Sequence, residues 1–206
     1  MSITRNLLVT ALLTSAGHAV AASSIDMSIR GSITPSACEL SLANGGVFDL
    51  GKVAAKDLQA EQPTNLEELN TQLAVTCEAA TLMGIEFKDN RAGSSFFDQD
   101  NTFGLGLING NQKLGHIGAT LTSYMADGTR AFGIHSMDGG LTWAAGGGAK
   151  PGSLSSVYTA APMAPVPVQV MTAKMILDAS IAPAKGLTLT DEVPIDGSIT
   201  MTVRYL

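Results

Sequence analysis

The sequence predicts an all-β domain, and three observations support this fold class. Glycine supplies 22 of the 206 residues, which is typical of a fold with many turns. Short runs that contain Val, Ile and Thr recur along the chain, and no long stretch shows the apolar period of an amphipathic helix. Because 45% of the residues are hydrophobic, the chain can bury one core, and strands at regular intervals favour a β-sandwich.

The charge of the chain limits its partners. Lys and Arg total 12 and are scattered, and the formal net charge is -6. Nucleic acids and anionic membrane surfaces bind clustered positive charge, so we expect neither as a partner.

The first residues have the order of a secretory signal peptide. Arg5 provides the positive charge, residues 7–16 form an apolar run too short to span a bilayer, and small residues follow at 19–22. We therefore predict a signal peptide over residues 1–22 and export of the remainder.

Export predicts a structural role for the two cysteines. Cys38 and Cys77 are the only cysteines, and an even pair in an oxidising compartment most simply forms one disulfide. A redox site would need a Cys-x-x-Cys motif and a metal site would need further Cys or His nearby, and neither pattern is present.

The last strand of the printed sequence alternates strictly. Its apolar residues fall on one face of an extended strand, and they are Ile199, Met201, Val203 and Tyr205. With no later strand to cover its free edge, we expect other polypeptides to cover it.

The segment after the signal peptide is a second alternating strand. Residues 23–34 carry apolar positions at every other residue, and these are Ile25, Met27, Ile29, Gly31 and Ile33. An ordinary first strand of a sandwich explains the same pattern. Gly31 favours a strand that another chain approaches closely, because glycine otherwise weakens a strand.

The ends and first half of the exported chain resemble a pilin subunit of the chaperone-usher pathway. The resemblance rests on the alternating strand before Cys38 with Gly31 in it, on Cys77, on the run VFDLGKV at residues 47–53, and on the last strand with penultimate Tyr205.

This resemblance implies an immunoglobulin-like sandwich that lacks its last strand and is completed by donor-strand complementation. Residues 23–34 would be the donor extension and residues 35–206 the sandwich. A periplasmic chaperone would first fill the groove beside the last strand and hold the Leu206 carboxylate with basic residues. At an outer-membrane usher, the extension of a neighbouring subunit would replace the chaperone, building a fimbria on the cell surface. The acceptor residues would then be Ile199, Met201, Val203, Tyr205 and Leu206.

The rest of the chain reads as strands and turns. We expect strands at 36–42, 46–50, 73–77, 82–87 and 171–181, a hairpin over 103–108 and 113–121, and one helical turn at 65–69 within a polar connection.

Residues 136–143 match the Ser-x-Asp-x-Gly-x-Thr-Trp pattern of the Asp-box of sialidases. The resemblance implies a tight hairpin in which Asp138 caps the backbone and Trp143 packs beneath it. The motif occurs once, the chain is too short for a propeller, and few scattered arginines remain to bind a sialic acid carboxylate. We therefore treat a sialidase-like enzyme as a minor alternative.

No other motif predicts chemistry. No nucleophile elbow or acid pair is present, and the calcium-loop-like run at 98–109 has Phe103 where the loop needs glycine. We expect no enzyme activity, no cofactor and no metal. The main alternative to a fimbrial subunit is a secreted binding module or tip adhesin, which would complete its own sheet and use the region 138–153 to hold a ligand.

Overall fold

The computed structural model describes residues 27–28, 37–97 and 101–206. The chain divides into two units between Thr34 and Pro35, and all named strands belong to the second. The expected signal peptide and the donor residues Ile25, Ile29, Gly31 and Ile33 lie outside the described residues.

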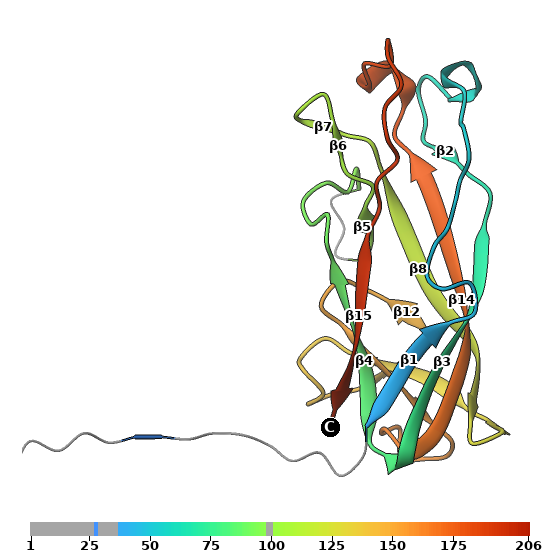
Figure 1. The fold of residues 1–206 in the computed structure, drawn as a ribbon, viewed down its shortest axis with the longest axis vertical. Coiled ribbons are helices and arrows are strands. Elements are labelled where there is room, and N and C mark those ends of the chain that lie inside the picture. Colours follow the sequence, from blue (N-terminus) through green and yellow to red (C-terminus); the bar gives the residue numbers. More distant parts are fainter. Residues whose placement is uncertain (1–26, 29–36, 98–100) are drawn as a thin grey trace, which may run out of the picture. The chain divides into compact units, whose positions relative to one another are not determined.

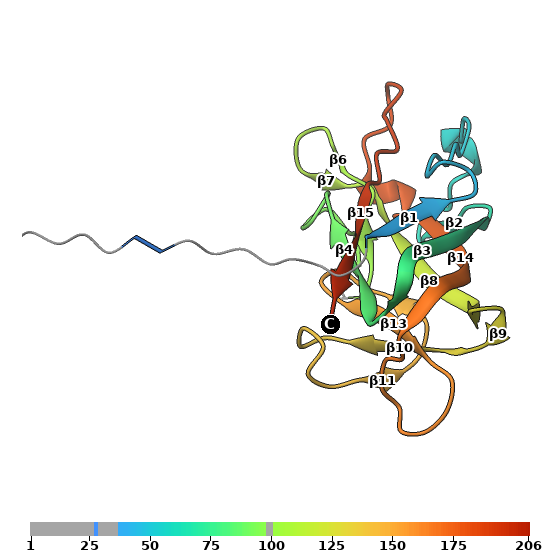
Figure 2. The same ribbon diagram turned by 60° about the horizontal axis from the view of Figure 1, so that its bottom comes forward.

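The second unit is a β-sandwich of two antiparallel sheets (Figures 1 and 2), as the sequence predicts. The larger sheet has the order β1 (Cys38–Leu42), β3 (Leu69–Thr81), β14 (Val168–Ile181), β8 (Gly115–Ala126) and β12 (Gly148–Ala149). Three short strands extend it, β2 (Thr64–Asn65) on β14, and β5 (Phe103–Gly104) and β9 (Thr129–Arg130) on β8.

The smaller sheet has the order β11 (Ala144–Ala145), β10 (Phe132–Ser136), β13 (Leu154–Tyr158), β4 (Met83–Asp89) and β15 (Ile199–Tyr205). A hairpin of β6 (Leu107–Ile108) and β7 (Gln112–Lys113) stands apart, and two 3-10 turns complete the unit, η1 (Ala55–Asp57) and η2 (Ala184–Gly186). Among the described residues, no helix is long and apolar enough to cross a membrane.

The apolar alternation of the strands builds the core. Leu73 and Val75 of β3 are fully buried, whereas Ala74 between them is half-buried and the polar Gln72 and Thr76 beside them are exposed. On β14, Met171 and Met175 face the same interior while Lys174 points outward. Strands with one buried and one solvated face alternate in this way, which is why sequence periodicity located them.

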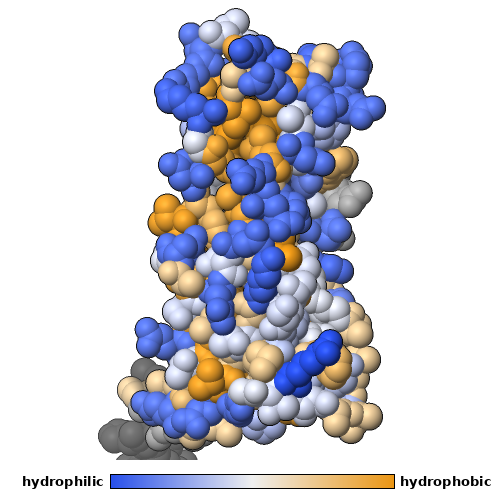
Figure 3. Space-filling view, turned by 90° about the vertical axis from the view of Figure 1, so that its right-hand side faces the viewer, coloured by the Kyte–Doolittle hydropathy of each residue, from blue (hydrophilic) through white to orange (hydrophobic). Residues whose placement is uncertain are grey.

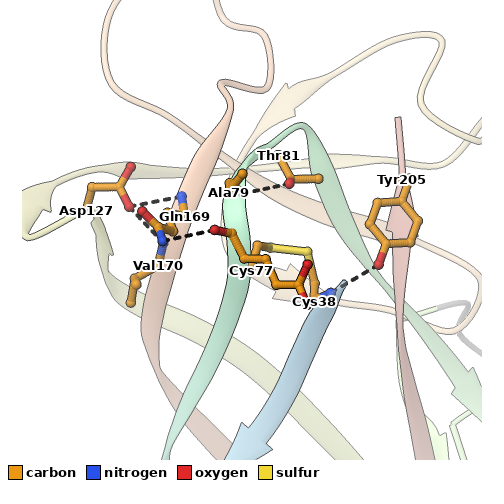
Figure 4. Close-up of a disulfide and its surroundings, with 9 residues drawn as sticks. Cys38, Cys77, Ala79, Thr81, Asp127, Gln169, Val170 and Tyr205 are labelled. Atoms are coloured by element: carbon orange, nitrogen blue, oxygen red, sulfur yellow. Dashed lines mark hydrogen bonds between the residues drawn. A yellow bond between two sulfur atoms is a disulfide. The ribbon is translucent and has the colours of Figure 1, made fainter. Parts of the chain in front are cut away.

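A disulfide joins Cys38 to Cys77, which lie opposite each other in the β1–β3 pair. This confirms the predicted pairing (Figure 4). A disulfide of this kind is typical of proteins exported to an oxidising compartment.

Two local predictions were wrong. Gly46 lies in a turn and residues 47–50 belong to no strand, and residues 65–69 form no helical turn. In the second case Leu66 donates its backbone N–H to Ala179 on β14, so tertiary pairing overrides the local helical spacing.

Candidate functional site

Two sheet edges face each other without pairing. Within the described residues β15 pairs only with β4, and β1 pairs only with β3. The two strands belong to opposite sheets, yet Cα atoms of β1 and β15 approach within 8 Å. Figures 1 and 2 show them side by side and running in opposite directions. Directly paired strands lie about 4.8 Å apart, and within the described residues β1 and β15 form no such pair. A strand inserted between them would need about twice that spacing, so the two edges must part where they approach most closely.

The free edge of β15 consists of its odd-numbered residues. The backbone N–H of Asn90 donates to the carbonyl of Ser198, and the backbone N–H of Leu206 donates to the carbonyl of Leu82. The even-numbered positions of this segment therefore direct their backbone groups toward β4. Because hydrogen-bonding direction alternates along an antiparallel strand, Ile199, Met201, Val203 and Tyr205 direct their N–H and C=O groups away from β4. Ile199, Met201 and Val203 also turn their half-buried side chains onto the core.

The free edge of β1 has the complementary arrangement. The backbone N–H of Ala43 donates to the carbonyl of Gln72, and the backbone N–H of Glu78 donates to the carbonyl of Ala37. The odd-numbered positions along β1 therefore direct their backbone groups toward β3. Leu40 and Leu42 therefore present their backbone groups to the gap and their side chains to the core.

An apolar groove lies between these edges. Its central cavity has a volume of about 240 Å³ and adjoins a second one of about 520 Å³. Segments far apart in sequence line the central part, and its apolar lining residues are Leu42, Phe48, Leu50, Leu69, Leu105, Ile117, Met175, Leu177, Ala179, Ile195, Ile199 and Met201.

Beyond the two strands, both walls continue as unpaired extended chain. Phe48 and Leu50 on one wall, and Ile195 and Gly197 on the other, make no backbone hydrogen bond within the described residues. The segment 46–50 has the alternating pattern of a strand, but among the described residues no strand pairs with it.

A hydrogen bond joins the two walls at the end where β15 stops. There Cys38 donates its backbone N–H to the hydroxyl of Tyr205 at 3.1 Å (Figure 4). The tyrosine ring thus bridges the two walls, and it satisfies one of the outward-facing N–H groups of β1.

One wall is fixed by an arginine–carboxylate pair just before β15. Arg91 donates to both Asp196 oxygens, at 2.9 and 2.8 Å, and Asp196 donates its own N–H to Leu105. The hydrogen bond from Arg91 is the main reason that the pKa of Asp196 lies below its usual value. A bidentate pair of this geometry holds the 195–198 segment in place.

At the wider end of the groove the walls carry charge. Lys52 on one wall lies 3.2 Å from Glu192 on the other, and both side chains are largely exposed. Leu58, Leu189 and Val193 line the cavity beneath. Figure 3 shows hydrophobic surface framed by hydrophilic side chains on the half of the unit that carries η1 and η2.

Of the predicted acceptor residues, Ile199, Met201, Val203 and Tyr205 lie on the free edge of β15. Leu206 follows the strand and donates its N–H to Leu82 on the β4 side, and Tyr205 and Leu206 are each 42% exposed. Of the predicted donor residues the structure describes Met27 alone, which is 85% exposed. Sequence reasoning did not assign the opposite wall to the site, although the alternation of Phe48 and Leu50 was visible.

The hairpin that joins β10 to β11 has the bonding expected of an Asp-box. Asp138 accepts hydrogen bonds from the N–H and hydroxyl of Thr142 at 2.9 and 2.6 Å, and from the Ser136 hydroxyl at 2.7 Å. These bonds, chiefly that of the Thr142 hydroxyl, hold the pKa of Asp138 well below its ordinary value. Trp143 donates its indole N–H to Gly140. The motif is a fully bonded turn, as predicted.

Within the described residues, no group of three or more His, Cys, Asp or Glu side chains could hold a metal ion.

Comparison with known proteins gives a family and two relatives. The family model described as "Protein of unknown function (DUF1120)" matches residues 27–145. Protein GltF of Escherichia coli K12 is 28% identical over 240 aligned residues, which cover 95% of this chain and 94% of GltF. Uncharacterized protein YhcF of the same organism is 27% identical over 119 residues, covering 56% of this chain and 45% of YhcF.

Proposed function

Since this chain belongs to the DUF1120 family, whose function is unknown, we propose from the geometry of its groove that it is a fimbrial subunit that polymerises by donor-strand exchange. In this proposal residues 23–34 of one copy fill the groove between β1 and β15 of the next. A periplasmic chaperone fills the groove beforehand, and an outer-membrane usher receives the subunit.

The observation that carries the proposal is the pair of facing, unpaired edges above an apolar floor. An inserted strand would pair its backbone with both edges and bury alternate side chains, which is how strand addition gives affinity and specificity. Each buried aliphatic side chain would contribute about 1.5–3 kcal/mol.

The groove and the donor segment also match in length. Odd-numbered positions from Ile195 to Val203 form one wall, and alternate apolar positions run from Ile25 to Ile33 in the extension. Each stretch covers eight residue steps, or about 26 Å of extended chain. One segment therefore suffices to fill the groove.

The shape of the groove favours one direction of insertion. Tyr205 bridges the walls at one end through its hydrogen bond with Cys38, whereas the Lys52–Glu192 ion pair at the other end is exposed, and exposed ion pairs are weak. The strand therefore enters, and its parent domain stays, at that other end, near Ile195. Ile33 then lies near Ile195 and Ile25 near Val203, which makes the donor antiparallel to β15.

The test is a matched pair of donor variants in the full chain, expressed with its secretion machinery. Ile29→Asp places a charge on the face that enters the groove, whereas Ser28→Asp places the same charge on the opposite face. We expect wild-type and Ser28→Asp proteins to form denaturant-resistant ladders on gels, and Ile29→Asp to abolish them.

Ladders that survive Ile29→Asp would show that the extension does not join subunits. A wild-type protein that folds as a stable monomer would instead favour the binding-module alternative, in which the extension completes its own sheet.

A further inference from the structure

Two large apolar side chains project from the Asp-box turn into solvent. Leu141 is 84% exposed and Met137 is 53% exposed. They flank a turn whose own polar groups are bonded internally, so neither side chain is needed to hold it. Single exposed apolar residues are ordinary, but two on one rigid turn indicate a contact surface.

This turn lies beside the end of β15. A side-chain carbon built on Gly140 would lie 3.4 Å from Cδ2 of Leu206, whose neighbour Tyr205 accepts the Cys38 N–H. The exposed turn and the start of β1 thus share one end of the sandwich.

Chain length then restricts where a neighbouring copy can lie. Five residue steps separate Ile33 from Cys38, and a chain of that length spans at most about 18 Å. If residues 23–34 occupy a neighbour's groove with Ile33 near Ile195, the wide end of that groove must lie close to the donor's turn.

The wide end of the groove offers a complementary surface. Its cavity of about 520 Å³ extends past Ile195 and has an apolar lining that includes Val53, Leu58, Leu189 and Val193. The donor strand ends at Ile195 in the antiparallel arrangement and leaves this cavity unfilled. Ala55 lies on its rim and is exposed.

We propose that the turn carrying Met137 and Leu141 docks into this wide-end cavity of the next copy, as a second contact between successive subunits. The inference rests on the proposed donor-strand function. It adds a head-to-tail contact of the heterologous kind, which generates open filaments rather than closed rings. Because the turn is rigid before it docks, little conformational entropy is lost on binding.

Engineered cysteines test the contact in the full chain. Leu141→Cys keeps a small apolar side chain at the tip, and Ala55→Cys places the second thiol on the rim of the cavity. The control pairs Leu141→Cys with Ala80→Cys, an exposed alanine on β3 that does not line the cavity. The native cysteines are already bonded to each other. Ladders are assembled, oxidised, boiled in denaturant to remove donor-strand links, and compared with and without reductant.

We expect covalent oligomers from the first pair, at about tenfold the level of the control pair, since a tethered neighbour raises the effective concentration of the second thiol. Ladders that form normally but yield no covalent link between residues 141 and 55 would overturn the docking while leaving donor-strand exchange intact. The absence of ladders in the wild type would overturn both. A covalent link from residue 141 to a different protein would assign the turn to another partner and also overturn this contact.

Discussion

Single side chains hold the loops of this domain through charge-assisted hydrogen bonds. Asp138 organises its turn by accepting from two groups of Thr142, and Arg91 fixes the segment before β15 through Asp196. Both carboxylates have a pKa below the ordinary value because their ionised forms are the ones that are hydrogen-bonded. A depressed pKa in the folded state ties the stability of these loops to pH.

For Asp138 the sign of this dependence follows from linkage. Its pKa is lower in the folded than in the unfolded protein, so its contribution is complete above the unfolded value of about 4 and is lost as pH falls further. We expect Asp138→Ala to lower the free energy of unfolding at pH 7, and the difference from wild type to shrink below pH 4. Urea unfolding at several pH values across this range measures the difference in the free energy of unfolding between the variant and the wild type. The control is Asp57→Ala, which removes an exposed carboxylate whose side chain makes no hydrogen bond within the described residues. A pH-independent difference for Asp138→Ala would contradict the linkage.

At the scale of elements, the disulfide secures the strand that forms one wall of the groove. β1 is an edge strand of five residues and pairs on one side only within the described part of the chain. Cross-linking it to β3 compensates for that limited pairing.

Removal of the disulfide should therefore be costly. The cysteines are 39 residues apart, and a loop of that length corresponds to about 4 kcal/mol in the chain-entropy model. We expect Cys38→Ala with Cys77→Ala to lower the free energy of unfolding by roughly this amount, measured by urea unfolding. Glu39→Ala with Thr76→Ala alters the adjacent facing pair without removing a cross-link and should cost far less. Equal losses in the two double variants would show that the cross-link adds little.

The elements also show which parts of the fold can be predicted from sequence. β3, β14 and β15 alternate because one face of each is buried, and that pattern is local. The segment 46–50 has the same pattern but no partner, and pairing is not a local property. The backbone N–H of Leu66 donates to the carbonyl of Ala179. The two residues are too far apart in sequence for a local pattern to predict this hydrogen bond. For the same reason one edge of the groove was predictable, whereas its opposite wall and floor were not.

The whole unit combines a closed core with an open groove. The main cluster of buried residues joins both sheets, yet Leu42, Phe48, Ile199 and Met201 pack against it only in part and line the cavity. A strand that filled the groove would bury these side chains further. On the proposed function, we therefore expect the domain alone to be less stable than the same domain with a strand bound.

This difference can be measured with a peptide of residues 23–34 added to the Ile29→Asp protein, whose own extension is impaired. At a hundredfold excess over its Kd, a ligand of the folded state adds about 2.7 kcal/mol, which for a domain of this size raises Tm by about 5–10 °C. The same peptide carrying Ile29→Asp is the control and should leave Tm unchanged. An identical Tm with either peptide would mean that the groove does not accept this segment.

The pairing of β4 with β15 has a consequence for the time course of folding. β4 (Met83–Asp89) can complete this pairing only when β15 (Ile199–Tyr205) is available, and most of the domain lies between the two strands in sequence. Contacts this distant close large loops and slow the search for the native topology. During synthesis the sheet that contains β4 thus lacks β15 until residues 199–205 have emerged, and its apolar face is exposed to aggregation for that interval.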